Sequence, residues 1–275
     1  MNKRDHLQPP PARGEGALGS NAAGAGGYLK VPPTAPKMRI GLLGGSFNPA
    51  HAAHRRISLA ALKRLGLDQV WWVVSPGNPL KASGMAPSLE ARVAVAKEVA
   101  RHPKIVVTAF EAGLDSPYTV DTVSFLRRRF PSVRFVWLMG ADNLAGLHRW
   151  QRWEELVALV PIAALDRPGY RLKALASRAA QRFASARVDE SDARGLAQLT
   201  PPAWTLLTIP LSPISSTALR ERGKRAVKQK QEKGSGKKAE KQRKRKAKSE
   251  EKAAKKAAKQ ADAKAKKRKG KDKPD

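Results

Sequence analysis

Gly44-Gly45-Ser46-Phe47-Asn48-Pro49-Ala50-His51-Ala52-Ala53-His54 is the stretch that decides the predicted fold. It follows an apolar, strand-like segment, residues 38–43, and it opens a segment, residues 51–65, whose apolar residues recur at helical spacing. A glycine turn between a strand and a helix lets backbone N–H groups approach a phosphate, with the positive end of the helix dipole behind them. The stretch therefore predicts a phosphate-binding turn.

Two histidines close this stretch. His51 and His54 are three positions apart, so they share one face of the first helical turn. Neutral or cationic imidazoles that face a phosphate can stabilise the charge that develops during phosphate transfer. The alternative is a tight turn with two surface histidines. We favour the phosphate site because the glycines and both histidines occur together.

The rest of the body alternates short β-branched or aromatic runs with longer amphipathic runs. Such alternation predicts an α/β fold, a Rossmann-like doubly wound parallel sheet with helices on both faces. Ligands of such sheets bind beyond the carboxyl ends of the strands, where the strand order reverses. The predicted strands are residues 38–43, 69–74, 104–110, 133–139, 161–165 and 204–209, and the predicted helices are residues 51–65, 88–101, 118–130, 143–159 and 171–184, with one more that begins near Ser215.

Composition divides the chain of 275 residues into three parts. Residues 1–37 are dominated by Pro, Gly and Ala and predict a disordered arm. Residues 38–223 form the body, which is long enough for one sizeable core. Residues 224–275 hold 24 Lys and Arg, 7 Asp and Glu, and no aromatic residue. This segment has too little apolar surface to offset its ordering entropy, so we expect a disordered basic tail.

Several classes of protein are excluded by what the sequence lacks. It has no cysteine, which excludes disulfides and thiolate metal sites and fits a cytoplasmic protein. It has no apolar run near the roughly 18–20 residues of a membrane span. The N-terminal arm lacks the continuous apolar core of a secretory signal. We therefore expect a cytoplasmic protein, and its oligomeric state stays open.

Polar clusters follow five of the predicted strands. After the glycine–histidine stretch they are Ser75–Lys81, Gly140–Asn143, Asp166–Gly169 and Ser212–Arg220. In the last cluster, Ser215, Ser216 and Thr217 precede Arg220 by about one helical turn. Capping a helix requires one hydroxyl, whereas three hydroxyls and an arginine at a helix N-terminus suit a polyphosphate.

These residues carry a resemblance. Gly44–Pro49 with His51 and His54, together with Ile214–Thr217 and Arg220, resemble the two motifs of the nucleotidylyltransferase superfamily. Three further features resemble the bacterial nicotinate-nucleotide adenylyltransferases within it: Asn78-Pro79-Leu80-Lys81, Tyr118–Thr122, and Met139–Leu144 leading to Trp150. The resemblance covers about residues 38–222.

The first motif departs from the family pattern at two positions. Ala53 stands where the family usually has glycine, and Asn48 stands where aspartate is commoner. Alanine is compatible with a helical turn, although its methyl group narrows the approach of a phosphate. We interpret both changes as variation rather than loss of function.

The resemblance implies adenylyl transfer from ATP to nicotinate mononucleotide, which gives deamido-NAD and pyrophosphate in NAD biosynthesis. It implies that Mg²⁺ bridges the ATP phosphates, held mainly by substrate oxygens and water. His51, His54 and Arg220 would then be catalytic. The implied ATP-binding residues are Gly44, Gly45, Ser46, Phe47, Gly140, Asp142, Ser215, Ser216 and Thr217. The implied acceptor-binding residues are Asn78, Lys81, Thr119, Trp150 and Arg167.

Alternatives remain at this stage. The acceptor could instead be nicotinamide mononucleotide or pantetheine phosphate. The chain could also be a nucleic-acid-binding protein that uses residues 224–275, since such a tail attracts nucleic acid weakly and without sequence preference through counterion release. Trp150 could be a core residue, and Asp142 and Arg167 could belong to simple turns. We expect Glu90 and Arg92 to form surface ion pairs at most.

Overall fold

The computed structural model describes residues 26–77, 87–210, 214, 216, 217, 219–221 and 225. Contacts within the chain define two compact units, Met1–Pro213 and Ile214–Asp275. All strands of the described residues belong to the first unit. Among the described residues, no helix is long and apolar enough to cross a membrane.

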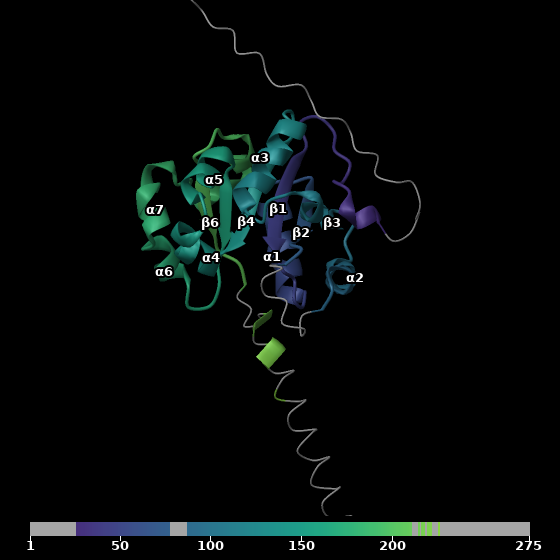
Figure 1. The fold of residues 1–275 in the computed structure, drawn as a ribbon. Helices are drawn as coiled ribbons and strands as arrows, with labels where there is room; N and C mark the ends of the chain where they lie inside the picture. Colours follow the sequence, from purple (N-terminus) through teal and green to yellow (C-terminus); the bar gives the residue numbers. More distant parts are fainter. Residues whose placement is uncertain are drawn as a thin grey trace, which may run out of the picture. The chain divides into compact units, whose positions relative to one another are not determined.

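Six parallel strands form one sheet in the order β3-β2-β1-β4-β5-β6, and Figure 1 labels all of them except β5. The strand order reverses between β1 and β4, because the chain leaves β3 at one edge and returns to the centre. A crevice at the carboxyl ends of β1 and β4 is thus where a ligand is expected. The strands are β1 (Arg39–Gly45), β2 (Gln69–Val74), β3 (Ile105–Thr108), β4 (Arg134–Gly140), β5 (Ile162–Leu165) and β6 (Trp204–Leu207).

Helices cover both faces of this sheet, and each face has its own core. One core joins the strands to α3 (Thr119–Arg129), α4 (Ala141–Gly146), α5 (Trp153–Leu159), α6 (Arg171–Leu175) and α7 (Arg178–Arg182). The other joins the strands to α1 (Ala52–Arg64), α2 (Leu89–Ala100) and η6, a 3-10 segment over Glu190–Gln198. The predicted doubly wound fold is confirmed.

Two predicted helices are in fact interrupted. The helix expected over residues 143–159 is divided into α4, the 3-10 turn η4 (Leu147–Arg149) and α5, because Arg152 before α5 has a left-handed φ of 55°. The helix expected over residues 171–184 is divided into α6 and α7, because Ser177 leaves the helical conformation and its hydroxyl accepts the Ala180 N–H. Local side-chain and backbone conformations thus override a continuous apolar pattern.

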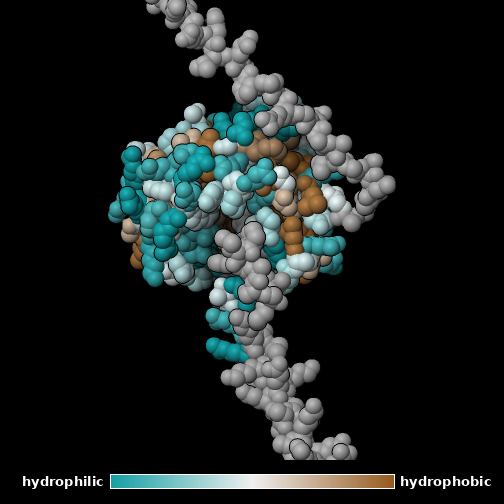
Figure 2. Space-filling view, viewed as in Figure 1, coloured by the Kyte–Doolittle hydropathy of each residue, from teal (hydrophilic) through white to brown (hydrophobic). Residues whose placement is uncertain are grey.

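The packed body begins before residue 38. The short 3-10 turn η1 (Gly27–Leu29) lies beside β3, where the Tyr28 carbonyl accepts the Ala109 N–H at 2.7 Å. The Thr108 hydroxyl donates to the carbonyls of Tyr28 and Lys30, each at 3.1 Å. Residues that we placed in the N-terminal arm are therefore part of the packed body. The surface seen in Figure 2 is mostly hydrophilic, with a hydrophobic band on the side of η1 and β3.

Candidate active site

The turn after β1 is held by aromatic packing. Phe47 has a positive φ of 46° and is only 2 % exposed. Its ring stacks on Trp72 of β2 with centroids 5.0 Å apart and lies 4.8 Å from the His54 ring. This packing stabilises a backbone conformation that a bulky residue rarely adopts.

Gly44 and Gly45, which we predicted in the turn, are the last two residues of β1, and they have different roles. A Cβ on Gly44 would come within 2.5 Å of Cη2 of Trp137, so the indole ring leaves room only for glycine. A Cβ on Gly45 would meet only Phe47, at an ordinary 3.8 Å. Packing therefore explains Gly44, whereas Gly45 is the glycine that leaves backbone open at the sheet edge.

His51 and His54 lie side by side at the start of α1. Their ring centroids are 3.8 Å apart. The backbone N–H of His51 donates to Nδ1 of His54 at 3.2 Å. Because Nδ1 of His54 accepts this bond, the neutral imidazole carries its proton on Nε2, which is left as a donor.

Both histidines are held neutral near pH 7. Burial, then the neighbouring His51 and Arg167, lowers the pKa of His54 from 6.5 to about 3. Burial and the charge of Arg167 lower the pKa of His51 as well. In the free protein the pair thus offers neutral N–H donors, and a bound polyanion would raise both pKa values by favouring the cation.

Two consecutive hydrogen bonds, through the buried Ser58 and Trp72, hold the backbone carbonyl of His54. Ser58, one turn further along α1, is fully buried, and its hydroxyl donates to the His54 carbonyl at 2.9 Å. The indole N–H of Trp72 donates to that hydroxyl at 2.7 Å. We did not predict Ser58 as a site residue. Its signal in the sequence is a serine on the same helical face as His54, in an otherwise apolar stripe.

Arg167 and Asp142 form an ion pair across the ends of β5 and β4. Nη1 of Arg167 lies 2.6 Å from Oδ2 of Asp142. The other carboxylate oxygen, Oδ1, is buried and has no hydrogen-bond partner among the described residues. A Cβ on Gly140 would lie 2.3 Å from this Oδ1, so glycine makes room for the pair. The pair lies at the same edge of the sheet as the histidines, because it follows β4 and β5 while they follow the neighbouring β1, and the charge of Arg167 acts on both histidines.

Asp166 orients this part of the site and was not predicted. It is 8 % exposed and accepts the backbone N–H of Arg167 at 2.8 Å. It also accepts from Arg171 at 3.2 Å, and Arg171 donates to the Thr208 hydroxyl at 2.9 Å. The loops after β5 and β6 are thereby tied together.

Of the other predicted acceptor residues, the structure describes Trp150 and Thr119. Trp150 is partly buried against the core, and its ring meets Trp137 edge to face at 6.4 Å between centroids. Since Trp137 also packs under Gly44, Trp150 lies one ring away from the turn after β1. Thr119 is the first residue of α3 and is partly exposed.

Other predicted residues cannot be placed against this site. Asn78, Lys81 and Ser215 lie outside the described residues. Ser216, Thr217 and Arg220 belong to the second unit, where Arg220 donates to the Thr217 hydroxyl at 3.1 Å. The binding of a polyphosphate by these residues stays a prediction.

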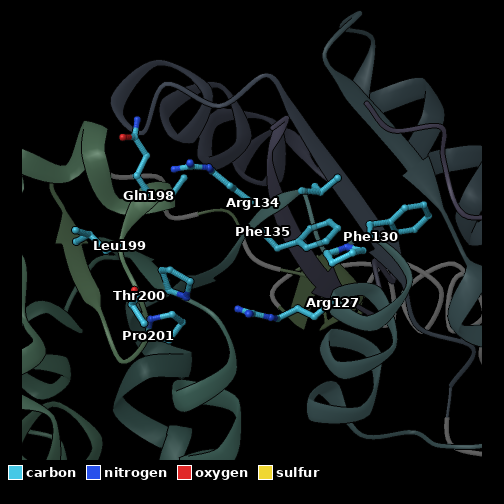
Figure 3. Close-up of a pocket in the computed structure, with 12 residues that line it drawn as sticks. Arg127, Phe130, Arg134, Phe135, Gln198, Leu199, Thr200 and Pro201 are labelled. Carbon is cyan, nitrogen blue, oxygen red and sulfur yellow. The ribbon is translucent and has the colours of Figure 1, made fainter. Parts of the chain in front are cut away.

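A pocket of about 280 Å³ lies at the opposite, amino-terminal edge of the sheet (Figure 3). In Figure 3, Arg127 lies on one side and Thr200 and Pro201 lie on the other. None of the predicted site residues lines it; its lining residues are Arg127, Phe130, Pro131, Val133, Arg134, Phe135, Pro161, Ala197, Gln198, Leu199, Thr200 and Pro201.

A doubly wound sheet with a histidine pair at its strand-order switch and an arginine after the neighbouring β5 suits the transfer of a nucleotide phosphate, and the comparisons identify the class as nucleotidyltransferase. Residues 42–222 match the cytidylyltransferase-like family, and the chain belongs to this family. Similar proteins include "Probable nicotinate-nucleotide adenylyltransferase" of Methylorubrum extorquens strain PA1, 57 % identical over 185 residues, which covers 67 % of this chain and 100 % of that protein. The protein of the same name from Cereibacter sphaeroides is 54 % identical over 187 residues, covering 68 % and 99 % of the two chains.

A solved structure shares the fold. The nicotinic acid mononucleotide adenylyltransferase of Plasmodium falciparum, complexed with NaAD, matches with a TM-score of 0.51 and 19 % identity. The match covers 67 % of this chain and 83 % of that one.

Proposed function

We propose that this chain transfers the adenylyl group of ATP to nicotinate mononucleotide and forms deamido-NAD and pyrophosphate, a step of NAD biosynthesis. The observation that carries the proposal is the His51–His54 pair at the strand-order switch. It occurs in a chain that matches nicotinate-nucleotide adenylyltransferases over nearly their whole length.

The reaction is one displacement at phosphorus. A 5′-phosphate oxygen of nicotinate mononucleotide attacks the α-phosphorus of ATP, and a new P–O bond forms. The bond from the α-phosphorus to the bridging oxygen breaks, and pyrophosphate leaves with its electron pair. Positioning and neutralisation of charge supply the catalysis in such transfers.

His51 and His54 are the residues to which we assign charge stabilisation. The neutral Nε2–H of His54 donates to a phosphate oxygen, and the pair gains positive character as the polyphosphate binds. We assign the backbone N–H groups of Ser46 and Phe47, in the turn after β1, to the same nucleotide. Gly140 and Asp142, assigned to ATP, and Arg167, assigned to the acceptor, lie together at the carboxyl ends of β4 and β5.

The remaining assignments rest on the motifs of the sequence. Ser215, Ser216, Thr217 and Arg220 would hold the β- and γ-phosphates that leave as pyrophosphate. Asn78 and Lys81 would bind the phosphate of the mononucleotide. Thr119 would offer backbone N–H groups at the start of α3 to the nicotinate carboxylate, and Trp150 would stack on the pyridine ring.

Mg²⁺ would be held on the substrate rather than by the protein. Within the described residues, no three His, Asp or Glu side chains are grouped as metal ligands. The N–H donors of the site, from the His pair and Arg167, suit phosphate oxygens. When bound, Mg²⁺ would neutralise part of the polyphosphate charge.

The acceptor is tested with purified protein, ATP and Mg²⁺ by following pyrophosphate release. Nicotinate mononucleotide, nicotinamide mononucleotide and pantetheine phosphate are each offered at equal concentration. We expect the highest kcat/KM with nicotinate mononucleotide. Equal or better turnover with either other acceptor would refute the assignment.

The basic tail and the cytoplasmic location stay predictions. Deleting residues 224–275 should leave turnover unchanged and abolish salt-sensitive retention on immobilised RNA. If turnover collapses instead, these residues belong to the active enzyme.

A further inference from the structure

Arg92 of α2 is buried, contrary to the surface ion pairs that we expected for it. It is only 6 % exposed. Its guanidinium donates to three backbone carbonyls: Nη1 to Ser46 at 2.8 Å and to Ser75 at 2.7 Å, and Nη2 to Pro76 at 2.9 Å. No carboxylate of the described residues pairs with it, so a full positive charge is buried against neutral oxygens.

Such an arrangement is costly for a helix that only has to pack. Burying a charge costs free energy unless hydrogen bonds compensate, and an apolar side chain of similar size would often be more stable. A guanidinium carries five N–H donors in a fixed planar fork, so Arg92 bonds the three carbonyls in one set geometry. Arg92 therefore holds two loops in one geometry.

The two loops are the ones that flank the predicted phosphate site. Ser46 lies in the turn after β1, between Gly45 and Phe47. Ser75 and Pro76 directly follow β2. A second bond, from the Ser75 N–H to the Gly45 carbonyl at 2.9 Å, joins the same loops. Arg92 therefore connects the turn assigned to ATP with the loop that leads into Asn78, assigned to the acceptor.

The bonds to Arg92 also orient backbone donors. In a trans peptide the C=O and the following N–H point in opposite directions. Carbonyls of Ser46 and Pro76 that point at Arg92 turn the N–H groups of Phe47 and Gly77 away from it. Neither N–H has an acceptor among the described residues. Gly77 has a φ of 102°, which glycine adopts readily.

We infer that Arg92 is a positioning residue for the transfer reaction, which sets the spacing between the Ser46 turn and the Ser75–Gly77 loop and aims the N–H groups of Phe47 and Gly77 at the substrates' phosphates. This inference rests on the proposed function for the identity of the substrates. It assigns no direct contact between Arg92 and either substrate.

The test compares Arg92→Lys with the matched control Arg55→Lys. Arg55 of α1 also bonds a carbonyl, that of Ala100 at 3.2 Å, but it touches neither loop. A misplacement of about 1 Å costs roughly a hundredfold in rate. We expect kcat/KM of Arg92→Lys to fall by about ten- to a hundredfold, with a lower kcat and a higher KM for both substrates, and near-normal values for Arg55→Lys.

Three further measurements distinguish a positioning role of Arg92 from a purely structural one. Added guanidinium should restore part of the activity of Arg92→Gly. Amide exchange at Ser75, whose N–H donates to the Gly45 carbonyl, should be faster in Arg92→Lys than in Arg55→Lys. ATP binding, measured by equilibrium dialysis, should be weaker in Arg92→Lys even if the acceptor proves to be different. Unchanged kcat, KM and ATP affinity in folded Arg92→Lys would show that Arg92 is only structural.

Discussion

Charged and polar side chains are buried at the carboxyl edge of the sheet, whereas an ion pair at the amino edge is partly exposed. At the carboxyl edge, His51, Arg92 and Asp166 are at least nine-tenths buried. His51 Nδ1 and Asp142 Oδ1 are buried there without a hydrogen-bond partner among the described residues. At the amino edge, Arg39 and Asp68 pair at 2.9 Å with side chains 31 % and 38 % exposed.

This difference matters for locating the site. The pocket of about 280 Å³ lies at the amino edge, yet the charges of the neighbouring Arg39–Asp68 pair are partly solvated and satisfied. Buried polar groups that lack partners are costly unless a ligand completes them. The carboxyl edge is therefore the better candidate for catalysis, although the pocket of about 280 Å³ lies at the amino edge.

The largest expected effect is from His54→Ala. Loss of a donor to a developing charge typically costs about 10²–10³ in kcat, so pyrophosphate release should fall by that factor while far-UV circular dichroism is unchanged. The matched control is His102→Ala, because His102 lies just before β3 at the amino edge. A similar loss in both variants would break the contrast between the edges.

Substitutions at Gly44 and Gly45 distinguish a packing role from a binding role at the carboxyl edge. Gly44→Ala should lower the free energy of unfolding by about 1–3 kcal/mol, because the methyl group overlaps the rigid Trp137 indole. Gly45→Ala has space for its Cβ, so it should keep its stability and raise the KM for ATP. Urea unfolding and steady-state kinetics measure the two effects. If Gly45→Ala leaves the KM for ATP unchanged, backbone approach at this glycine is refuted.

Acid should destabilise the free protein through His54. Its pKa is about 3 in the fold and ordinarily 6.5, so between these values the unfolded chain binds a proton that the native state does not. Stability is therefore present above pH 6.5 and falls below it, by at most about 1.4 kcal/mol per pH unit from this group. Unfolding of wild type and His54→Gln at pH 7.5 and pH 5 measures the difference. Equal pH dependence in both proteins would show that His54 is not the group responsible.

The smallest effect is expected at the amino edge. Asp68→Asn weakens a half-exposed pair with Arg39, and such pairs contribute about 0–1 kcal/mol. The melting temperature should fall slightly, and kcat and KM should stay at wild-type values. A change in kcat comparable to that of His54→Ala would mean that the amino edge takes part in the reaction.

Much of the fold was predictable because it depends on local pattern. The apolar runs predicted all six strands, and the glycine–histidine stretch predicted the turn after β1. The break before α5 was not predictable, because Arg152 adopts a left-handed backbone that no residue preference favours. Arg92 had a signal that we missed: it is four and eight positions before the buried Ala96 and Ala100, on the inner stripe of α2.

Residue order therefore sets the elements, their parallel arrangement and the chemistry available at the strand ends, because periodicity and turn preference act over a few positions. Only the tertiary structure decides which of these groups are buried and paired. Residues distant in sequence lower the pKa of His54 and supply the carboxylate that pairs with Arg167. They also supply the three carbonyls that accept hydrogen bonds from Arg92. Desolvation and hydrogen bonding are properties of the packed site, so no local pattern contains them.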